Sequence, residues 1–76
     1  MDKLAIVVPC YNEEEVLKIA SKALREVLSD LVQKGKVAED SFILFVNDGS
    51  RDRTWELIEE ENRMYPAQVH GVKLAG

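Results

Sequence analysis

The sequence predicts a small α/β unit in the order strand, helix, strand, helix, strand, with a three-stranded parallel sheet. Residues 4–8 and 42–46 are short, apolar and rich in β-branched or aromatic residues, as buried strands are. Each is followed by a segment with the apolar spacing of an amphipathic helix, and residues 68–74 have the composition of a third strand. Strands that alternate with helices pair in parallel through right-handed crossovers.

Composition limits the size and the partners of this unit. The 76 residues form at most one small domain, and a hydrophobic content of 46% excludes intrinsic disorder. The net charge of −4 disfavours nucleic acid as a partner, because binding to phosphates requires a basic surface. Cys10 is the one cysteine, so an internal disulfide is excluded, and we interpret its thiol as a small apolar filler.

The first strand is expected to end at Pro9 and to be followed by a long helix. Asn12 is a candidate N-cap residue, and Glu15 stands three residues later, as in a capping box. Glu13 and Glu14 would then lie in the first turn, where carboxylates suit the helix dipole. Gly35 is the expected C-terminal stop. The apolar face of this helix should contain Val16, Ala20, Leu24, Val27 and Leu31, with Leu17 and Leu28 beside them.

The second strand, residues 42–46, leads into a turn at residues 47–50. A second helix is expected from Asp52 or Arg53 to about Met64, with Asp52 more suited to capping than to ligand contact. Pro66 ends this helix, because the residue before a proline disfavours the α region. Its inner side should contain Leu57, Ile58, Glu61 and Tyr65, in which Glu61 is the polar exception.

The order of the strands decides which surfaces are covered. If the strands lie in the order 3-2-1, both crossover helices fall on one face of the sheet. The opposite face and the free edge of the first strand would then be bare, although the strands are apolar at nearly every position. We therefore expect residues 1–76 to be the first, incomplete part of a larger domain. In isolation the chain is expected to self-associate through the exposed face or edge.

Two loops should meet at the carboxyl ends of the strands, where open α/β sheets bind ligands. Neighbouring strands lie about 4.8 Å apart, so the loops after the first and second strands form one rim. Tyr11 offers a flat face for a base, and the Glu13 and Asp48 carboxylates can accept hydrogen bonds from a base or a ribose. Gly49 would allow close approach of the backbone. The glycine fingerprints of dinucleotide and P-loop sites are absent, which favours a nucleoside held by carboxylates.

Two motifs resemble those of the inverting family 2 glycosyltransferases, which have the GT-A fold. Residues 8–14 read V-P-C-Y-N-E-E, similar to the V-P-x-Y-N-E-E opening of that family, and residues 46–54 read V-N-D-G-S-R-D-R-T, similar to its V-D-D-G-S-x-D-x-T segment. The branch that includes dolichyl-phosphate mannose synthases and bactoprenol glucosyltransferases is the most similar. The resemblance implies that this chain is the N-terminal, Rossmann-like half of a GT-A domain.

The resemblance also implies roles for individual residues. Pro9, Tyr11 and Glu13 would line the nucleoside pocket for a UDP- or GDP-sugar donor, Asp48 would hydrogen-bond the base, and Val46 could contact it. Asn47 replaces an aspartate that is frequent in the family, and its amide could orient Asp48 or cap the turn. The ligands of a divalent metal, Mg²⁺ or Mn²⁺, and the catalytic base lie further along in the family, so this chain alone should be inactive.

For the intact enzyme, the resemblance implies sugar transfer with inversion, to an acceptor that could be a polyprenyl phosphate. Its location would be cytoplasmic, at the inner face of the membrane. Two alternatives remain from the residues. One is a non-enzymatic nucleotide-binding module of Rossmann-like or flavodoxin-like fold. The other is a response-regulator-like domain, which is disfavoured because residues 9–11 occupy the place where those domains keep an acidic pair.

Overall fold

The computed structural model describes residues 2–74, which form one sheet of three parallel strands and two helices. The strand order is β1-β2-β3, which confirms both the predicted element order and the predicted 3-2-1 sheet. The elements are β1 (Ala5–Cys10), α1 (Leu17–Gln33), β2 (Phe42–Asn47), α2 (Thr54–Met64) and β3 (Val69–Lys73).

The three strands are aligned so that their carboxyl ends lie at one end of the sheet. In the β1–β2 pair, Ala5 is opposite Phe42 and Cys10 is opposite Asn47. β1 continues through Pro9 to Cys10, one residue beyond the expected end. A proline is tolerated there because β1 is an edge strand, so the ladder on its free side does not need the missing N–H. The loops that follow β1 and β2 therefore start side by side.

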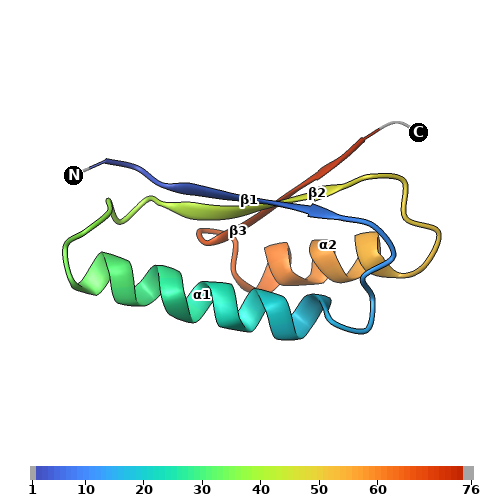
Figure 1. The fold of residues 1–76 in the computed structure, drawn as a ribbon, viewed down its shortest axis with the longest axis horizontal. Coiled ribbons are helices and arrows are strands. Elements are labelled where there is room, and N and C mark those ends of the chain that lie inside the picture. The colour runs from blue at the N-terminus through green and yellow to red at the C-terminus, as the bar shows by residue number, and fades with distance from the viewer. Residues whose placement is uncertain (1, 75–76) are drawn as a thin grey trace.

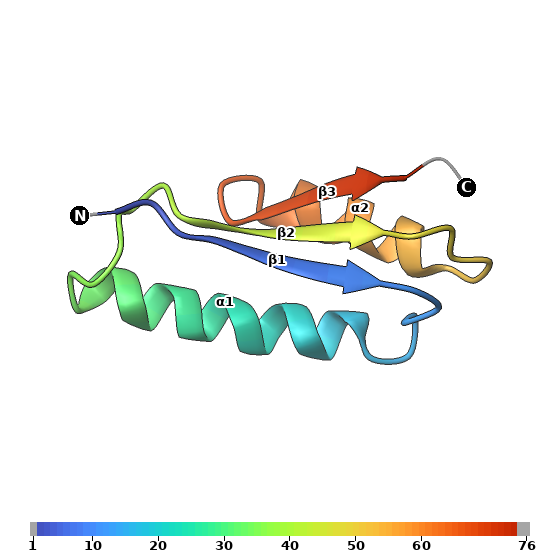
Figure 2. The same ribbon diagram turned by 45° about the horizontal axis from the view of Figure 1, so that its top comes forward.

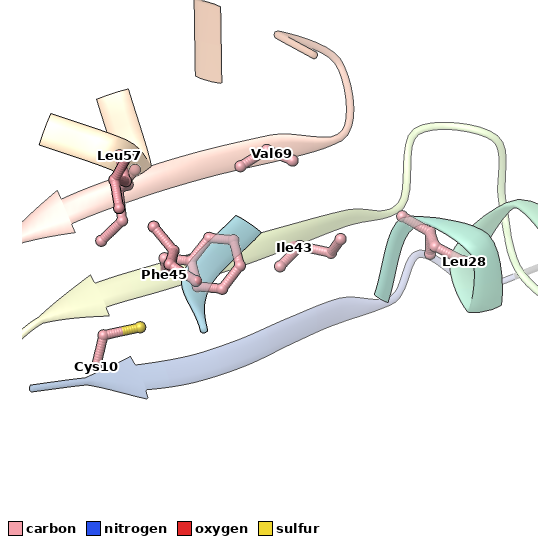
Figure 3. Close-up of a cluster of buried hydrophobic side chains, with 8 residues drawn as sticks. Cys10, Leu28, Ile43, Phe45, Leu57 and Val69 are labelled. Carbon is pink, nitrogen blue, oxygen red and sulfur yellow. The ribbon is translucent and has the colours of Figure 1, made fainter. Parts of the chain in front are cut away.

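Both helices cover the same face of the sheet, as the strand order requires (Figures 1 and 2). The core lies between this face and the helices, with Ile43 and Phe45 of the central strand fully buried. Figure 3 shows these side chains among residues from every strand and from both helices. The remaining fully or nearly fully buried apolar residues are Cys10, Leu17, Leu28, Leu57, Ile58 and Val69.

The opposite face of the sheet, called the open face below, has no helix over it among residues 2–74. Strand alternation places Val7 and Leu44 on it, in register with each other and with His70 of β3. Val7 is 58% exposed and Val72 is 42% exposed. The expectation that an apolar face and the β1 edge are bare in this part of the chain is thus confirmed.

The start of α1 differs from the prediction. The helix begins at Leu17, and its N-cap position is Val16, which makes no side-chain capping hydrogen bond. Asn12 is not the cap: its φ is 50°, in the left-handed region, and residues 13–16 form a separate turn. Both Val16 N–H and Leu17 N–H donate to the Glu13 carbonyl in this turn. The capping-box prediction fails because the Asn12 side chain is used in a contact with the second loop.

The buried side of α1 is also rotated relative to the predicted apolar face. Leu17 and Leu28 are buried, whereas Val16 and Val27 are 48% and 52% exposed. The C-terminus agrees with the prediction: Gly35 has a φ of 70°, its N–H donates to Val32, and the Lys36 N–H donates to Leu31. This pair of hydrogen bonds is the Schellman motif that a C-terminal glycine favours.

Glu61, the polar exception on the inner side of α2, is explained by a partner on α1. It is 3% exposed, and its carboxylate lies 3.7 Å from the Arg25 guanidinium. Arg25 also lies over the Tyr65 ring, 3.7 Å from its centroid, and donates to Ser21. The Arg25–Glu61 ion pair and the Arg25–Tyr65 stack thus connect α1 to the end of α2, at a point where the contact between the helices is polar.

Candidate functional site

The candidate site is the rim, defined here as residues 11–16 after β1 and residues 48–53 after β2. The two loops leave the same end of the sheet (Figure 2). A hydrogen bond of 2.9 Å from the Asp48 N–H to the Cys10 carbonyl extends the β1–β2 pairing into the start of both loops. The predicted meeting of the two loops is therefore present in the structure.

Asn12 connects the two loops by two hydrogen bonds. Its N–H donates to Ser50 Oγ at 3.0 Å, and its Oδ1 accepts from the Arg51 N–H at 2.9 Å. The left-handed backbone of Asn12 turns its N–H and its side chain toward the same neighbouring loop. Asparagine is one of the few residues other than glycine that enter this region readily. We therefore interpret Asn12 as a connector between the loops.

Thr54 and Asp52 add a second connection, next to the start of α2. The buried Thr54 hydroxyl accepts from the Glu13 N–H at 2.7 Å and donates to Asp52 Oδ1. The other carboxylate oxygen of Asp52 accepts from the Glu14 N–H at 3.2 Å. Asp52 Oδ1 also accepts from the Thr54 N–H, at 2.9 Å, which satisfies a donor at the start of the helix. The N-cap position of α2 is Arg53, which makes no side-chain capping hydrogen bond, so Asp52 is not the cap predicted for it. From one residue earlier, it bonds the first helical N–H and holds the first loop.

The ionised form of Asp52 is favoured by these contacts. Desolvation acts to raise the pKa of Asp52, but hydrogen bonds from the Thr54 hydroxyl and from the N–H groups of Thr54 and Glu14 outweigh it. The net effect lowers the pKa below its usual value. Cys10 differs, because burial and the nearby Glu13 charge raise the pKa of its thiol. A protonated, buried thiol agrees with its interpretation as a filler.

The predicted nucleoside-binding residues divide into groups by position. Tyr11 is 56% exposed at the rim, where Asp48 and Gly49 are exposed as well. Pro9 and Val46 are register partners on the open face, two residues before the rim. Gly49 has a φ of 69°, and a Cβ there would meet no atom within 4 Å, so its backbone conformation is what requires glycine.

Two hollows adjoin the rim, and neither contains all of the predicted residues. One, of about 210 Å³, lies between β1 and α1 and is lined by Pro9 and Glu13 together with apolar side chains. The other, of about 240 Å³, is lined by residues 12–16 and Asp52. Tyr11 and Asp48 line neither of them. The described residues thus bring the two loops together, and leave Tyr11 and Asp48 on the outer surface of the rim.

Asn47 behaves differently from the expectation that its amide would orient Asp48 or cap the turn. It is 1% exposed on the helix side of the sheet, and neither its Oδ1 nor its Nδ2 has a hydrogen-bond partner among the described residues. The roles of Ser50 and Thr54 as connectors were not predicted. The signal that could have indicated them is the presence of hydroxyl residues in the loop after a parallel strand and at the start of the next helix.

A parallel βαβαβ unit with two joined loops at its carboxyl end is Rossmann-like in connectivity. The sequence profile described as "Glycosyl transferase family 2" matches residues 5–75, and the chain belongs to this family.

Several curated proteins are similar to the chain. An uncharacterised glycosyltransferase of Bacillus subtilis, YkoT, is 56% identical over 72 residues, which are 95% of this chain and 21% of that protein. A dolichol-phosphate mannosyltransferase of Pyrococcus furiosus is 33% identical over 67 residues, 88% of this chain and 17% of that protein. A bactoprenol glucosyl transferase of Shigella phage SfV is 41% identical over 56 residues, 74% of this chain and 16% of that protein. No solved structure is significantly similar.

The chain thus spans about one fifth or less of the length of these relatives. Two further findings concern residues 2–74 alone. Neither α1 nor α2 combines the length and the apolar character needed to cross a bilayer. No group of three or more His, Cys, Asp or Glu side chains within this range is arranged to hold a metal ion.

Proposed function

We propose that the protein containing this chain transfers a sugar from a UDP- or GDP-sugar to an acceptor with inversion, and that residues 1–76 supply its donor-nucleotide loops. The observation that carries the proposal is the hydrogen-bonded junction of the two motif loops in a family 2 chain. A nucleoside at this rim would meet groups of both loops at once. That is the arrangement expected for ligand sites at the carboxyl ends of parallel strands.

The exposed side chains at the rim have the chemistry for a nucleoside. The Tyr11 ring is free to stack on a base, and such a contact contributes about 1–3 kcal/mol. The Glu13 and Asp48 carboxylates are solvent-accessible acceptors for a base N–H or a ribose hydroxyl. We assign Pro9, Val46 and Gly49 to the wall of the same site, because Pro9 and Val46 lie just before the rim and Gly49 is part of it.

The domain that contains these loops is proposed to continue beyond this sequence. The bare open face and the free edge of β1 call for a further strand beside β1 and a helix over that face. The first two crossovers run from β1 to β2 and from β2 to β3. A connection from β3 back to the free side of β1 crosses the sheet in the opposite direction. If that connection is right-handed as well, its helix lies on the open face.

Metal and acceptor chemistry belong to the same proposal. A divalent cation would neutralise the diphosphate leaving group, and we propose that its protein ligands belong to a further part of the domain. The same applies to the base that activates the acceptor. We propose a polyprenyl phosphate as the acceptor, supported by the names of two relatives, and a location at the cytoplasmic face of the membrane.

The test is a calorimetric titration of the full-length protein with UDP, GDP, UDP-sugars and GDP-sugars, with and without Mn²⁺. We expect one of the two nucleotides to bind, and the full-length protein to transfer sugar while residues 1–76 alone do not. Tyr11→Ala and Asp48→Ala should each weaken nucleotide binding by about fivefold or more, because each removes one contact of about 1 kcal/mol or more.

A matched control is Lys22→Ala, an exposed position on α1 away from the rim, which should bind as the parent does. Binding unchanged in both rim variants would contradict the residue assignments. Binding without transfer by the full-length protein would favour the non-enzymatic nucleotide-binding module instead.

A further inference from the structure

We infer that Asn12 and Thr54 are positioning residues of the donor site. They would hold the first loop, which carries Tyr11 and Glu13, at a fixed place against the second loop, which carries Asp48. This inference rests on the proposed function, and it concerns residues that do not themselves contact the nucleotide.

Asn12 stands between the two proposed ligand residues of the first loop, Tyr11 and Glu13. Its left-handed φ of 50° is unfavourable for most residues and is held by the hydrogen bonds with Ser50 and Arg51. Both bonds join exposed segments, so their contribution to global stability is small. Their geometric effect is larger, because they set the direction of the residues on either side of Asn12.

Thr54 fixes the same loop to the interior. Its side chain is fully buried at the first residue of α2, and its hydroxyl accepts from the Glu13 N–H at 2.7 Å. The backbone of the exposed Glu13 is thereby hydrogen-bonded to α2, a helix that packs against the sheet. A hydroxyl at this place both accepts from the loop and donates to Asp52, which a methyl group of the same size cannot do.

Joined in this way, the loops present their side chains before the ligand arrives. A loop that must be ordered during binding loses affinity by the free energy of that ordering. Two exposed loops without cross-connections would each carry that loss. The connections through Asn12 and Thr54 therefore favour binding without any contact to the ligand.

The experiment measures the affinity of the full-length protein for UDP or GDP, whichever the parent binds. Thr54→Val and Asn12→Ala should each weaken binding by about fivefold to tenfold, the effect of losing about one ordering hydrogen bond. Thr54→Ser keeps the hydroxyl, and Asn12→Asp keeps an acceptor and tolerates the left-handed region. Both conservative variants should bind within about twofold of the parent.

Two controls separate positioning from stability. Leu28→Val perturbs the core at the other end of the cluster from Cys10, the last residue of β1 (Figure 3). It should lower the thermal midpoint and leave the affinity unchanged. In a Tyr11→Ala background, Thr54→Val should have a smaller effect than in the parent, because one of the contacts it positions is already gone.

Parent-like nucleotide affinity in Thr54→Val and Asn12→Ala would overturn the inference. A loss of affinity in Leu28→Val, or in the two conservative variants, as large as that in Thr54→Val and Asn12→Ala would also overturn it. If Thr54→Val does not fold, the exposed Asn12 pair decides the question. A parent that binds neither nucleotide would contradict the proposed function itself, which is a different result from a binding parent with unaffected variants.

Discussion

Asp52 accepts hydrogen bonds from the first loop and from the start of α2. Its negative charge strengthens both. One carboxylate oxygen accepts from Thr54 and the other from Glu14. Each bond is favoured when the carboxylate is ionised, so the lowered pKa of Asp52 and the order of the rim have the same origin. A residue in this motif can thus contribute to a ligand site without facing the ligand.

This origin gives a pH dependence with a definite sign. Because the folded-state pKa of Asp52 is below its ordinary value of 3.8, the ionised carboxylate stabilises the fold above that value. The stabilisation is lost as the pH falls through the lowered pKa. We expect the free energy of unfolding of the full-length protein to fall as the pH drops from about 5 to below 3.8, and to fall less in Asp52→Asn.

Chemical denaturation across this pH range measures the effect. Glu59→Gln, an exposed carboxylate on α2, is the matched control and should follow the parent. If Asp52→Asn has the same pH dependence as the parent, the hydrogen bonds do not favour the ionised form as the structure indicates.

At the scale of elements, the two helices are joined by a polar contact within an otherwise apolar layer. The Arg25 and Glu61 side chains are 18% and 4% exposed, so neither charge is well solvated. Removal of one partner of such a pair leaves the other charge buried without compensation, at a cost of about 3 kcal/mol or more. Replacement of both by apolar side chains avoids that cost.

We therefore expect Arg25→Leu to lower the free energy of unfolding by about 3 kcal/mol. The double variant Arg25→Leu, Glu61→Leu should be more stable than Arg25→Leu alone. Thermal and denaturant unfolding provide the measurement. Additive losses in the double variant would show that the two charges are not coupled.

At the scale of the whole molecule, one apolar sheet face has no cover among the described residues. Three strands of five or six residues, about 4.8 Å apart, present a face of about 300 Å². A stable interface buries about 800 Å² on each partner. We propose that isolated residues 1–76 associate weakly through this face and do not form a stable dimer.

Val7→Lys together with Val72→Lys should reduce this association, because both residues are exposed on the open face. Sedimentation velocity over a range of concentrations measures it. Val27→Lys is the matched control, since Val27 is about as exposed but lies on α1. An isolated chain that stays monomeric at high concentration would contradict this expectation.

Local sequence patterns were enough to predict the elements and their order along the chain, because apolar runs and helical spacing are local properties. For the expected 3-2-1 sheet, the right-handed crossover rule then places both helices on one face and leaves the other bare. The meeting of the two loops followed for the same reason, since parallel strands end on one side. The C-terminal stop at Gly35 was predictable because its cause is local.

Contacts between distant segments set how the side chains at the junction are used. Asn12 has the sequence context of a helix cap, yet it contacts the second loop, because hydrogen-bond partners from a distant segment compete with local ones. The rotation of α1 and the pairing of Glu61 with Arg25 were likewise set by packing between elements. Local patterns specify what a segment can form, and only the neighbouring segments determine which of its groups find partners.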